Sequence, residues 1–234
     1  MGLVQFGGGV VQISGSIAGT THARNRFGNY IRPRTKPVDP KSARQTAARL
    51  LVIMLAEQWR EPPMTDTIRG VWDTYAAAVA MKNRLGQEVH LTGFNHFVRS
   101  NAARIAAGLD MVTDGQTSLG LPNADPTFAV EGSEASGELS ITFDNTLDWA
   151  GETGGALSVE FCTPQNPTRN FFGGPFRNAG SVLGDDTTPP TSPATMDAPF
   201  SLVELQKSVC RARVIRLDAR VSTHFRCDPF AVGA

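Results

Sequence analysis

Acidic residues are missing from the first 38 positions of this 234-residue chain, although the whole chain has 22 acidic and 22 basic residues. Five basic residues precede Asp39, the first acid: Arg24, Arg26, Arg32, Arg34 and Lys36. A segment with charge of one sign is typical of an arm that holds an anionic or acidic partner.

Cysteine is also scarce, with only Cys162, Cys210 and Cys227 in the chain. The odd count and the absence of a CxxC spacing argue against a disulfide framework or a zinc knuckle, and a reducing compartment is the simplest interpretation. A bridge between Cys162 and Cys210, across the two sheets of a sandwich, stays open as an alternative to buried free thiols.

Signatures of catalysis and of cofactor binding are absent from the sequence. It contains no GxxxxGK[ST] loop, and no helical pattern follows the glycines at 7–9. The histidines at 22, 90, 96 and 224 show no metal-ligand spacing, and we expect His96 on the polar side of a helix. We therefore expect no enzyme activity, no metal and no cofactor.

Long hydrophobic runs are missing as well. The longest apolar run, residues 50–56, is far too short to span a bilayer. We expect a soluble protein without a membrane partner.

The first 38 residues are expected to form an extended arm. Residues 2–20 are rich in glycine and predict at most one or two short strands that become ordered by docking against a neighbour. Residues 20–38 follow neither the helical nor the strand period, and Pro33 and Pro37 favour extended backbone. Phe27 and Tyr30 lie among the arginines, which suits anchoring in a protein groove, stacking on nucleic acid, or a solvated loop.

Residues 39–110 predict a small three-helix unit. The first helix is expected to start at an Asp39 cap with Pro40 and to run to about Arg60. Thr65 can cap the second helix and Thr92 the third. The apolar stripe of the first helix comprises Ala43, Ala47, Leu50, Leu51, Met54 and Leu55. The expected aromatic core comprises Trp59, Trp72, Phe94 and Phe97.

A linker of turn-forming residues at 111–126 separates this unit from a domain at 127–234. Alternating patterns predict antiparallel strands at 127–131, 138–143, 156–162, 209–217 and 220–226, the last two as a hairpin. Residues 163–200 are expected to form a long loop, whose Phe171, Phe172 and Phe176 pack on a sheet or on a neighbouring subunit. The predicted fold class is α+β: an extended arm, three helices and an antiparallel β-sandwich.

Several segments resemble a family of tailed-phage and prophage virion proteins. They read GSIAGTTHARNRFGNYIRPRTKPVDPKSARQ at 15–45, TDTIRGVWDTYA at 65–76 after Trp59, NRLGQEVHLTGFNHFVRSN at 83–101, and PQNPTRNFFGGPFR at 164–177. The closing LDARVSTHFR, at 217–226, is similar to the last hairpin of fibronectin type III or immunoglobulin-like domains. The resemblance implies a virion structural component with an immunoglobulin-like sandwich.

Three functions remain as hypotheses. The first is a structural protein of a bacteriophage virion, made in the host cytoplasm and held by its arm; a capsid-associated decoration or minor capsid protein is favoured over a tail or neck component. Its partners would be the major capsid protein or tail subunits and copies of itself, bound through the arm residues Arg24, Arg26, Phe27, Tyr30, Arg32, Arg34 and Lys36, with Phe171, Phe172 and Phe176. The second is a nucleic-acid-binding module that uses the basic arm. The third is a carbohydrate-binding or hydrolytic domain around Trp149 and the 171–176 loop.

Overall fold

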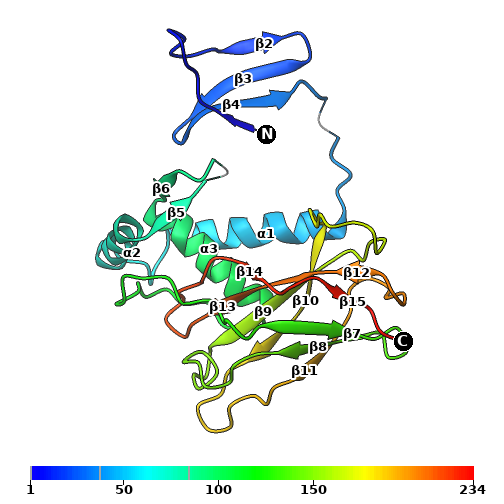
Figure 1. Ribbon diagram of the computed structural model, residues 1–234. Coiled ribbons are helices and arrows are strands. Elements are labelled where there is room, and N and C mark those ends of the chain that lie inside the picture. Colours follow the sequence, from blue (N-terminus) through cyan, green and yellow to red (C-terminus); the bar gives the residue numbers. More distant parts are fainter. Residues whose placement is uncertain (1, 37, 84) are drawn as a thin grey trace.

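The computed structural model describes residues 2–36, 38–83 and 85–234, and it stacks them in layers (Figure 1). A small N-terminal sheet lies at one end, three helices follow, and two further sheets lie at the other end. Pro37, which we expected to favour extended backbone, lies outside the described residues.

The N-terminal sheet, here called the arm sheet, has four antiparallel strands in the order β1-β4-β3-β2. Their bounds are β1 Gly2–Val4, β2 Gly15–Ile17, β3 Thr20–Asn25 and β4 Gly28–Pro33. The prediction of an extended arm without a strand period across 20–38 was therefore wrong for β3 and β4. Both faces of this sheet are partly exposed, so its sequence lacks the one-sided alternation on which strand prediction depends.

The first helix, α1, spans Ala43–Gln58, and its cap is Ser42 rather than the predicted Asp39. Ser42 and Gln45 form a reciprocal capping box. Lys41 has a φ of +47°, which is incompatible with a helix that begins at Pro40.

The second helix, α2, spans Asp66–Ala78, and the third, α3, spans Gly93–Ala106. Thr65 and Thr92 cap them as predicted. The chain between them forms a hairpin of two short strands, β5 (Ala80–Lys82) and β6 (Glu88–His90).

The C-terminal half contains two antiparallel sheets, in the orders β10-β9-β13-β14 and β11-β8-β7. Their strands are β7 Ala129–Gly132, β8 Glu138–Thr142, β9 Ala156–Cys162, β10 Phe176–Leu183, β11 Ala194–Asp197, β13 Cys210–Ile215 and β14 Phe225–Arg226. A separate two-stranded sheet is formed by β12 (Lys207–Ser208) and β15 (Phe230–Ala231). One core lies between the two sheets and includes Leu139, Ile141, Val159, Phe161 and Val214. The fold is therefore a mixed α and β arrangement with antiparallel sheets.

Two predictions for this half need correction. Residues 163–200 are not one long loop, because they contain β10 and β11, which pair with β9 and β8. The predicted hairpin of 209–217 with 220–226 is reduced to two residue pairs of β13 with β14 and a single bridge between Ile215 and Val221. The turn at 218–219 is followed by non-strand chain, since Arg99 of α3 binds the carbonyl groups of Val221 and Ser222, at 2.7 and 2.6 Å.

Helix α3 covers the outer face of the sheet β10-β9-β13-β14. Ala103 and Ala107 pack on Ala156, Ile215 and Val221. The guanidinium of Arg104 also donates hydrogen bonds to the carbonyl groups of Gly154 and Arg216, at 3.0 and 2.8 Å. Among the described residues, no helix is both long and apolar enough to cross a membrane.

Candidate interaction surface

The basic residues of the arm gather on the β3–β4 hairpin. Arg24 lies on β3, Arg26 and Phe27 form the turn, and Tyr30 and Arg32 lie on β4. The turn is closed by the Phe27 N–H, which donates to the side-chain oxygen of Asn25 at 2.9 Å. Gly28 follows with a φ of +119°, a conformation that side chains disfavour. Arg34 and Lys36 follow β4 on the segment that leads to α1.

The charges of these arm residues are available to a partner. Within residues 2–36, 38–83 and 85–234, no ion pair involves any of the five basic side chains of the arm. The guanidinium of Arg24 has one weak contact, 3.5 Å to the side-chain oxygen of Gln12. An unpaired cationic surface of this kind favours an anionic or acidic partner.

The arm sheet has no core of its own. None of the residues described between 2 and 36 is buried, and Val11 and Ile17 are 85% and 60% exposed. A sheet is stable in water when it buries at least one face against another layer. The sheet therefore needs a further surface to cover it.

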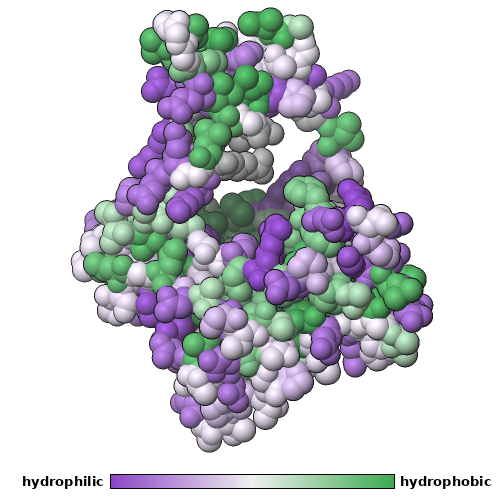
Figure 2. Space-filling model, viewed as in Figure 1, coloured by the Kyte–Doolittle hydropathy of each residue, from purple (hydrophilic) through white to green (hydrophobic). Residues whose placement is uncertain are grey.

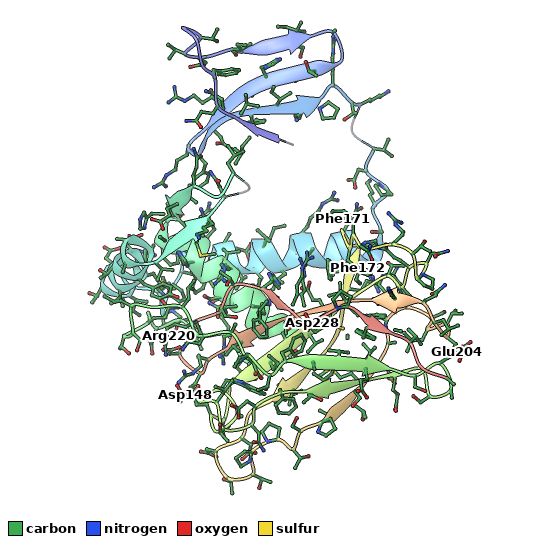
Figure 3. All side chains as sticks on the ribbon, in the orientation of Figure 1. Asp148, Phe171, Phe172, Glu204, Arg220 and Asp228 are labelled. Carbon is green, nitrogen blue, oxygen red and sulfur yellow. The ribbon has the colours of Figure 1, made fainter. Side chains whose placement is uncertain are left out.

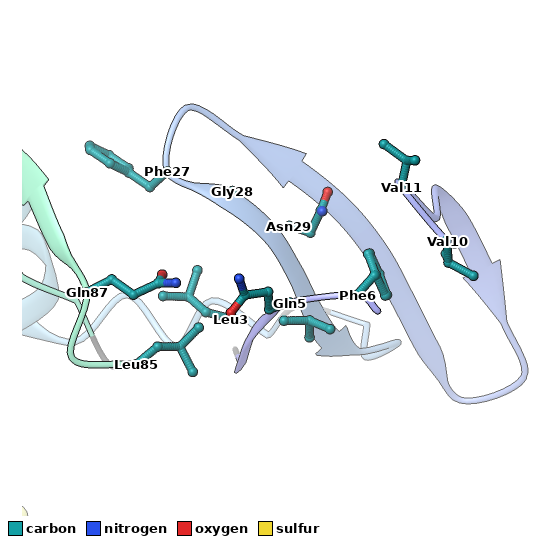
Figure 4. A pocket seen from close by; sticks show the side chains of 11 residues that line it. Leu3, Gln5, Phe6, Val10, Val11, Phe27, Gly28, Asn29, Leu85 and Gln87 are labelled. Carbon is teal, nitrogen blue, oxygen red and sulfur yellow. The ribbon is translucent and has the colours of Figure 1, made fainter. Parts of the chain in front are cut away.

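The arm sheet contacts the rest of the chain loosely, at the β5–β6 hairpin. A cavity of about 440 Å³ lies between Leu3, Phe6 and Phe27 of the arm and Leu85 and Gln87 of the hairpin loop (Figure 4). A second hollow of about 410 Å³ lies among Leu3, Phe27, Val89 and Leu91. These cavities show that the contact is not packed to the density of a protein interior.

The outward face of α1 is a second exposed apolar surface, one that we did not predict. Of the helix residues, Leu55 alone is buried and Leu51 is partly buried, and both pack toward the aromatic core with Trp72 and Phe97. We expected Leu50 and Met54 in that core, but both are exposed. The sequence signal was present, because the segment from Leu50 to Ala56 is apolar around the whole helix rather than on one stripe.

The three phenylalanines of the 171–176 segment do not form a single surface: of the two expected alternatives, packing on a sheet holds for Phe172 and Phe176, which therefore are not the partner contacts that we expected. Phe171 is 76% exposed, whereas Phe172 is buried in the core of the two sheets; in the view of Figure 3 both lie level with α1. The ring of Phe176 is held by the guanidinium groups of Arg211 and Arg226, which lie 4.2 and 5.3 Å from its centre. Phe171 is thus the one of the three that is free to contact a partner.

Ionisable groups pair with one another on the sheets. His224 and Arg211 together lower the pKa of Glu160 to about 2. The Nε of Arg211 lies 2.6 Å from one carboxylate oxygen of Glu160, and the Nε2 of His224 lies 3.8 Å from the other. Arg216 forms ion pairs with Asp148, at 2.8 Å, and with Glu152, at 2.5 Å. The side chains of Arg211 and Arg216 are mostly covered, and their ion pairs stabilise the fold.

The cysteines and Trp149 lie inside the fold. The thiols of Cys162, Cys210 and Cys227 are free and buried, so the alternative of a bridge between Cys162 and Cys210 is not what the structure shows. The hydrogen-bonded neighbour Cys227, together with burial, raises the pKa of Cys210. Trp149 is buried against Phe143 rather than presented to a carbohydrate. In the described part of the chain, no three His, Cys, Asp or Glu side chains are grouped so that they could hold a metal ion.

Comparison of the chain with protein-family models, with curated proteins and with solved structures gave no match.

Proposed function

We propose that this chain is a structural component of a tailed-bacteriophage virion, fastened to its neighbours by the arm sheet. A capsid-associated decoration protein or minor capsid protein is the favoured role, and a tail or neck component is the alternative. The observation that carries the proposal is an ordered sheet of four strands in which no described residue is buried.

The arm sheet lacks a hydrophobic core of its own among its described residues. A chain segment that cannot bury enough apolar surface by itself becomes stable when a partner supplies the missing layer. Assembly proteins use this device because an arm that orders on docking buries a large area per residue. The unpaired arginines of the β3–β4 hairpin add charge-assisted hydrogen bonds to carboxylates or carbonyl groups of the partner.

The remainder of the chain fits the same role. We propose that the two-sheet unit is an immunoglobulin-like or fibronectin type III-like module of the kind that phages display on heads and tails, and that it faces outward from the particle. The partners are then the major capsid protein or tail subunits, together with copies of this chain. Production in the bacterial cytoplasm and residence in the virion follow, and such a role needs no reaction centre.

Particle incorporation tests the proposal. A chain in which residues 2–36 are deleted should remain folded, but it should be absent from particles purified after co-expression with the other virion proteins. The full-length Asp197→Asn variant, altered at an exposed position on β11, should be incorporated like the unchanged chain. Equal incorporation of the deleted chain would overturn the role of the arm sheet, and exclusion of the full-length chain would overturn the virion assignment.

The copy number in purified particles separates the head from the neck. Hundreds of copies per particle would place the chain in the capsid lattice, whereas about a dozen would place it at a vertex, neck or tail, because these positions have low-order symmetry. Quantitative mass spectrometry against the major capsid protein provides the ratio.

Nucleic-acid binding is the second candidate, and the unpaired basic hairpin favours it. Arg24, Arg26 and Phe27 meet at one turn, and an aromatic ring among guanidinium groups suits stacking and phosphate contact. Fluorescence anisotropy with a labelled DNA duplex and a single strand tests it. Binding that falls steeply between 50 and 200 mM salt, about tenfold or more, would support this function, and no binding at 50 mM salt would remove it.

A further inference from the structure

Helix α1 presents an apolar face that no described residue of the chain covers. Leu50, Ile53 and Met54 are 59%, 52% and 40% exposed. They share one face of the helix because their spacing is i, i+3 and i+4, and Glu57 continues that face at i+7. Leu51 and Leu55, which pack on the aromatic core, lie on the adjacent face of the helix.

A helix that is apolar on two faces is normally buried on both. Three large aliphatic side chains within two turns form a contiguous patch, unlike the single exposed apolar residues that are common on monomers. The patch on α1 therefore has the character of an interface.

The arm sheet of the same chain does not close over this face. It is held to one side by its contact with the β5–β6 hairpin. In the space-filling view, an opening separates the arm sheet from the body, and hydrophobic surface lies along its lower side, over α1 (Figure 2). In the same view, the arm sheet lies above this opening and α1 lies below it.

We propose that a second copy of this chain occupies the patch, with the arm sheet of one copy lying on Leu50, Ile53 and Met54 of the next. Charge favours this occupant. The first 38 residues hold five basic and no acidic residues and carry +5, while the other residues hold 17 basic and 22 acidic residues and carry −5. The arm of one copy is thus attracted to the body of another, and a chain of zero net charge does not repel its copies at long range.

The local charges agree with this arrangement. Glu57 lies in the last turn of α1 and Glu61 lies just beyond its end. Both are exposed, and neither enters an ion pair within the described ranges. Arm arginines of the second copy can pair with them while Val10, Val11 and Ile17, the exposed apolar residues of the arm, cover the patch. The inference rests on the proposed function and names the partner and the surface for the arm sheet.

Single changes on the two flanks of α1 provide the first test. Ile53→Glu places a carboxylate in the patch. Val52→Glu is the matched control: Val52 is 49% exposed and Ile53 is 52% exposed, but the side chain of Val52 projects roughly 100° away from that of Ile53 around the helix. Sedimentation velocity should show concentration-dependent self-association of the unchanged chain and of Val52→Glu. For Ile53→Glu we expect the dissociation constant to rise at least about tenfold, because a carboxylate would be buried in an apolar contact. A monomeric unchanged chain, or equal association of both variants, would overturn the proposal.

Mixing two full-length variants provides the second test. One variant is Ile53→Glu, with an intact arm and a blocked α1; the other has Arg24, Arg26, Arg32 and Arg34 changed to Glu, with a reversed arm and an intact α1. Each variant alone should self-associate at least about tenfold more weakly than the unchanged chain. A mixture should nevertheless form a one-to-one complex at the affinity of the unchanged chain, because the intact arm of the first can dock on the intact α1 of the second. A mixture in which both remain monomeric would contradict the proposed contact.

The outcomes separate this inference from the proposed function. A chain that is monomeric at all concentrations but enters particles only with its arm would retain the virion function and would overturn self-association. A chain that associates through α1 and is excluded from particles would retain the contact and would overturn the virion function.

Discussion

At the scale of single residues, His96 has a clear consequence for the pH dependence of stability. Its ring is fully buried beside Tyr75, at 5.1 Å between ring centres, and neither ring nitrogen is hydrogen-bonded within the described residues. Burial, reinforced by the charge of Arg99, lowers the pKa of His96 to about 4. We expected this histidine on the polar side of α3, so the helical period predicted the helix but misplaced this side chain.

The depressed pKa predicts a loss of folding stability as the pH falls from about 6.5 to 4. In that range the unfolded chain binds a proton at His96, near its ordinary pKa of 6.5, while the folded chain does not. The difference corresponds to roughly 3 kcal/mol, which is fully lost only near pH 4. Urea unfolding should therefore show that, between pH 6.5 and pH 4, the free energy of unfolding falls less for His96→Leu than for the unchanged chain. The difference between the two falls should be roughly 3 kcal/mol.

A buried side chain of α3 that does not titrate supplies the control. Ser100→Ala should retain the pH dependence of the unchanged chain, because it leaves His96 in place. Parallel stability curves for His96→Leu and the unchanged chain would contradict a neutral, buried His96.

At the scale of elements, local signals decided what could be predicted. α2 and α3 have a threonine cap and a single apolar stripe, so their starts were predicted correctly. β10 was missed because it lies at the edge of its sheet, contains Gly180 and is irregular between Asn178 and Gly180, which breaks the period of two.

Of the two candidate interaction surfaces, the sequence predicted the basic arm but not the exposed face of α1. The basic composition of the arm and the all-round apolar character of residues 50–56 are visible in the sequence, but the sequence does not tell which apolar residues of α1 stay exposed. When a helix is apolar on two faces, its sequence does not specify which face packs on the body, because that choice is made by Trp72 and Phe97 from other elements.

Weak packing of α1 predicts rapid hydrogen exchange. α1 buries a single residue, Leu55, whereas α3 buries seven, including His96, Phe97 and Arg104. Because local opening costs less where few side chains are buried, amides of α1 should exchange at least about tenfold faster than those of α3 in dilute protein. Mass spectrometry of peptic peptides measures the two rates, with the α2 peptides as an internal reference. Equal protection of α1 and α3 in dilute protein would show that α1 is already covered.

At the scale of the whole molecule, charge and packing divide the chain at the same place. None of the described residues of the basic arm is buried, and the hydrophobic cores of the described chain draw their residues from positions 51–232. Arg99 and Arg104 of α3 join the helices to the C-terminal half of the chain. The small side chains of α3 and β9 also pack against each other there. The arm sheet can therefore respond to a partner without disturbing the part of the chain that holds its own cores.

This division predicts that the body is stable without the arm. Deletion of residues 2–36 should shift the melting temperature of the dilute protein by no more than about 2 °C, because no residue of the hydrophobic cores is removed. Differential scanning calorimetry measures the shift. The Leu139→Ala variant provides the contrast, because it leaves a cavity in the core between the two sheets. This variant should lower the free energy of unfolding by roughly 2–5 kcal/mol and should therefore lower the melting temperature by far more than the deletion. A deletion that destabilised the protein as strongly as Leu139→Ala would mean that the arm sheet supports the fold of its own chain, and its role would then be structural within the monomer rather than between copies.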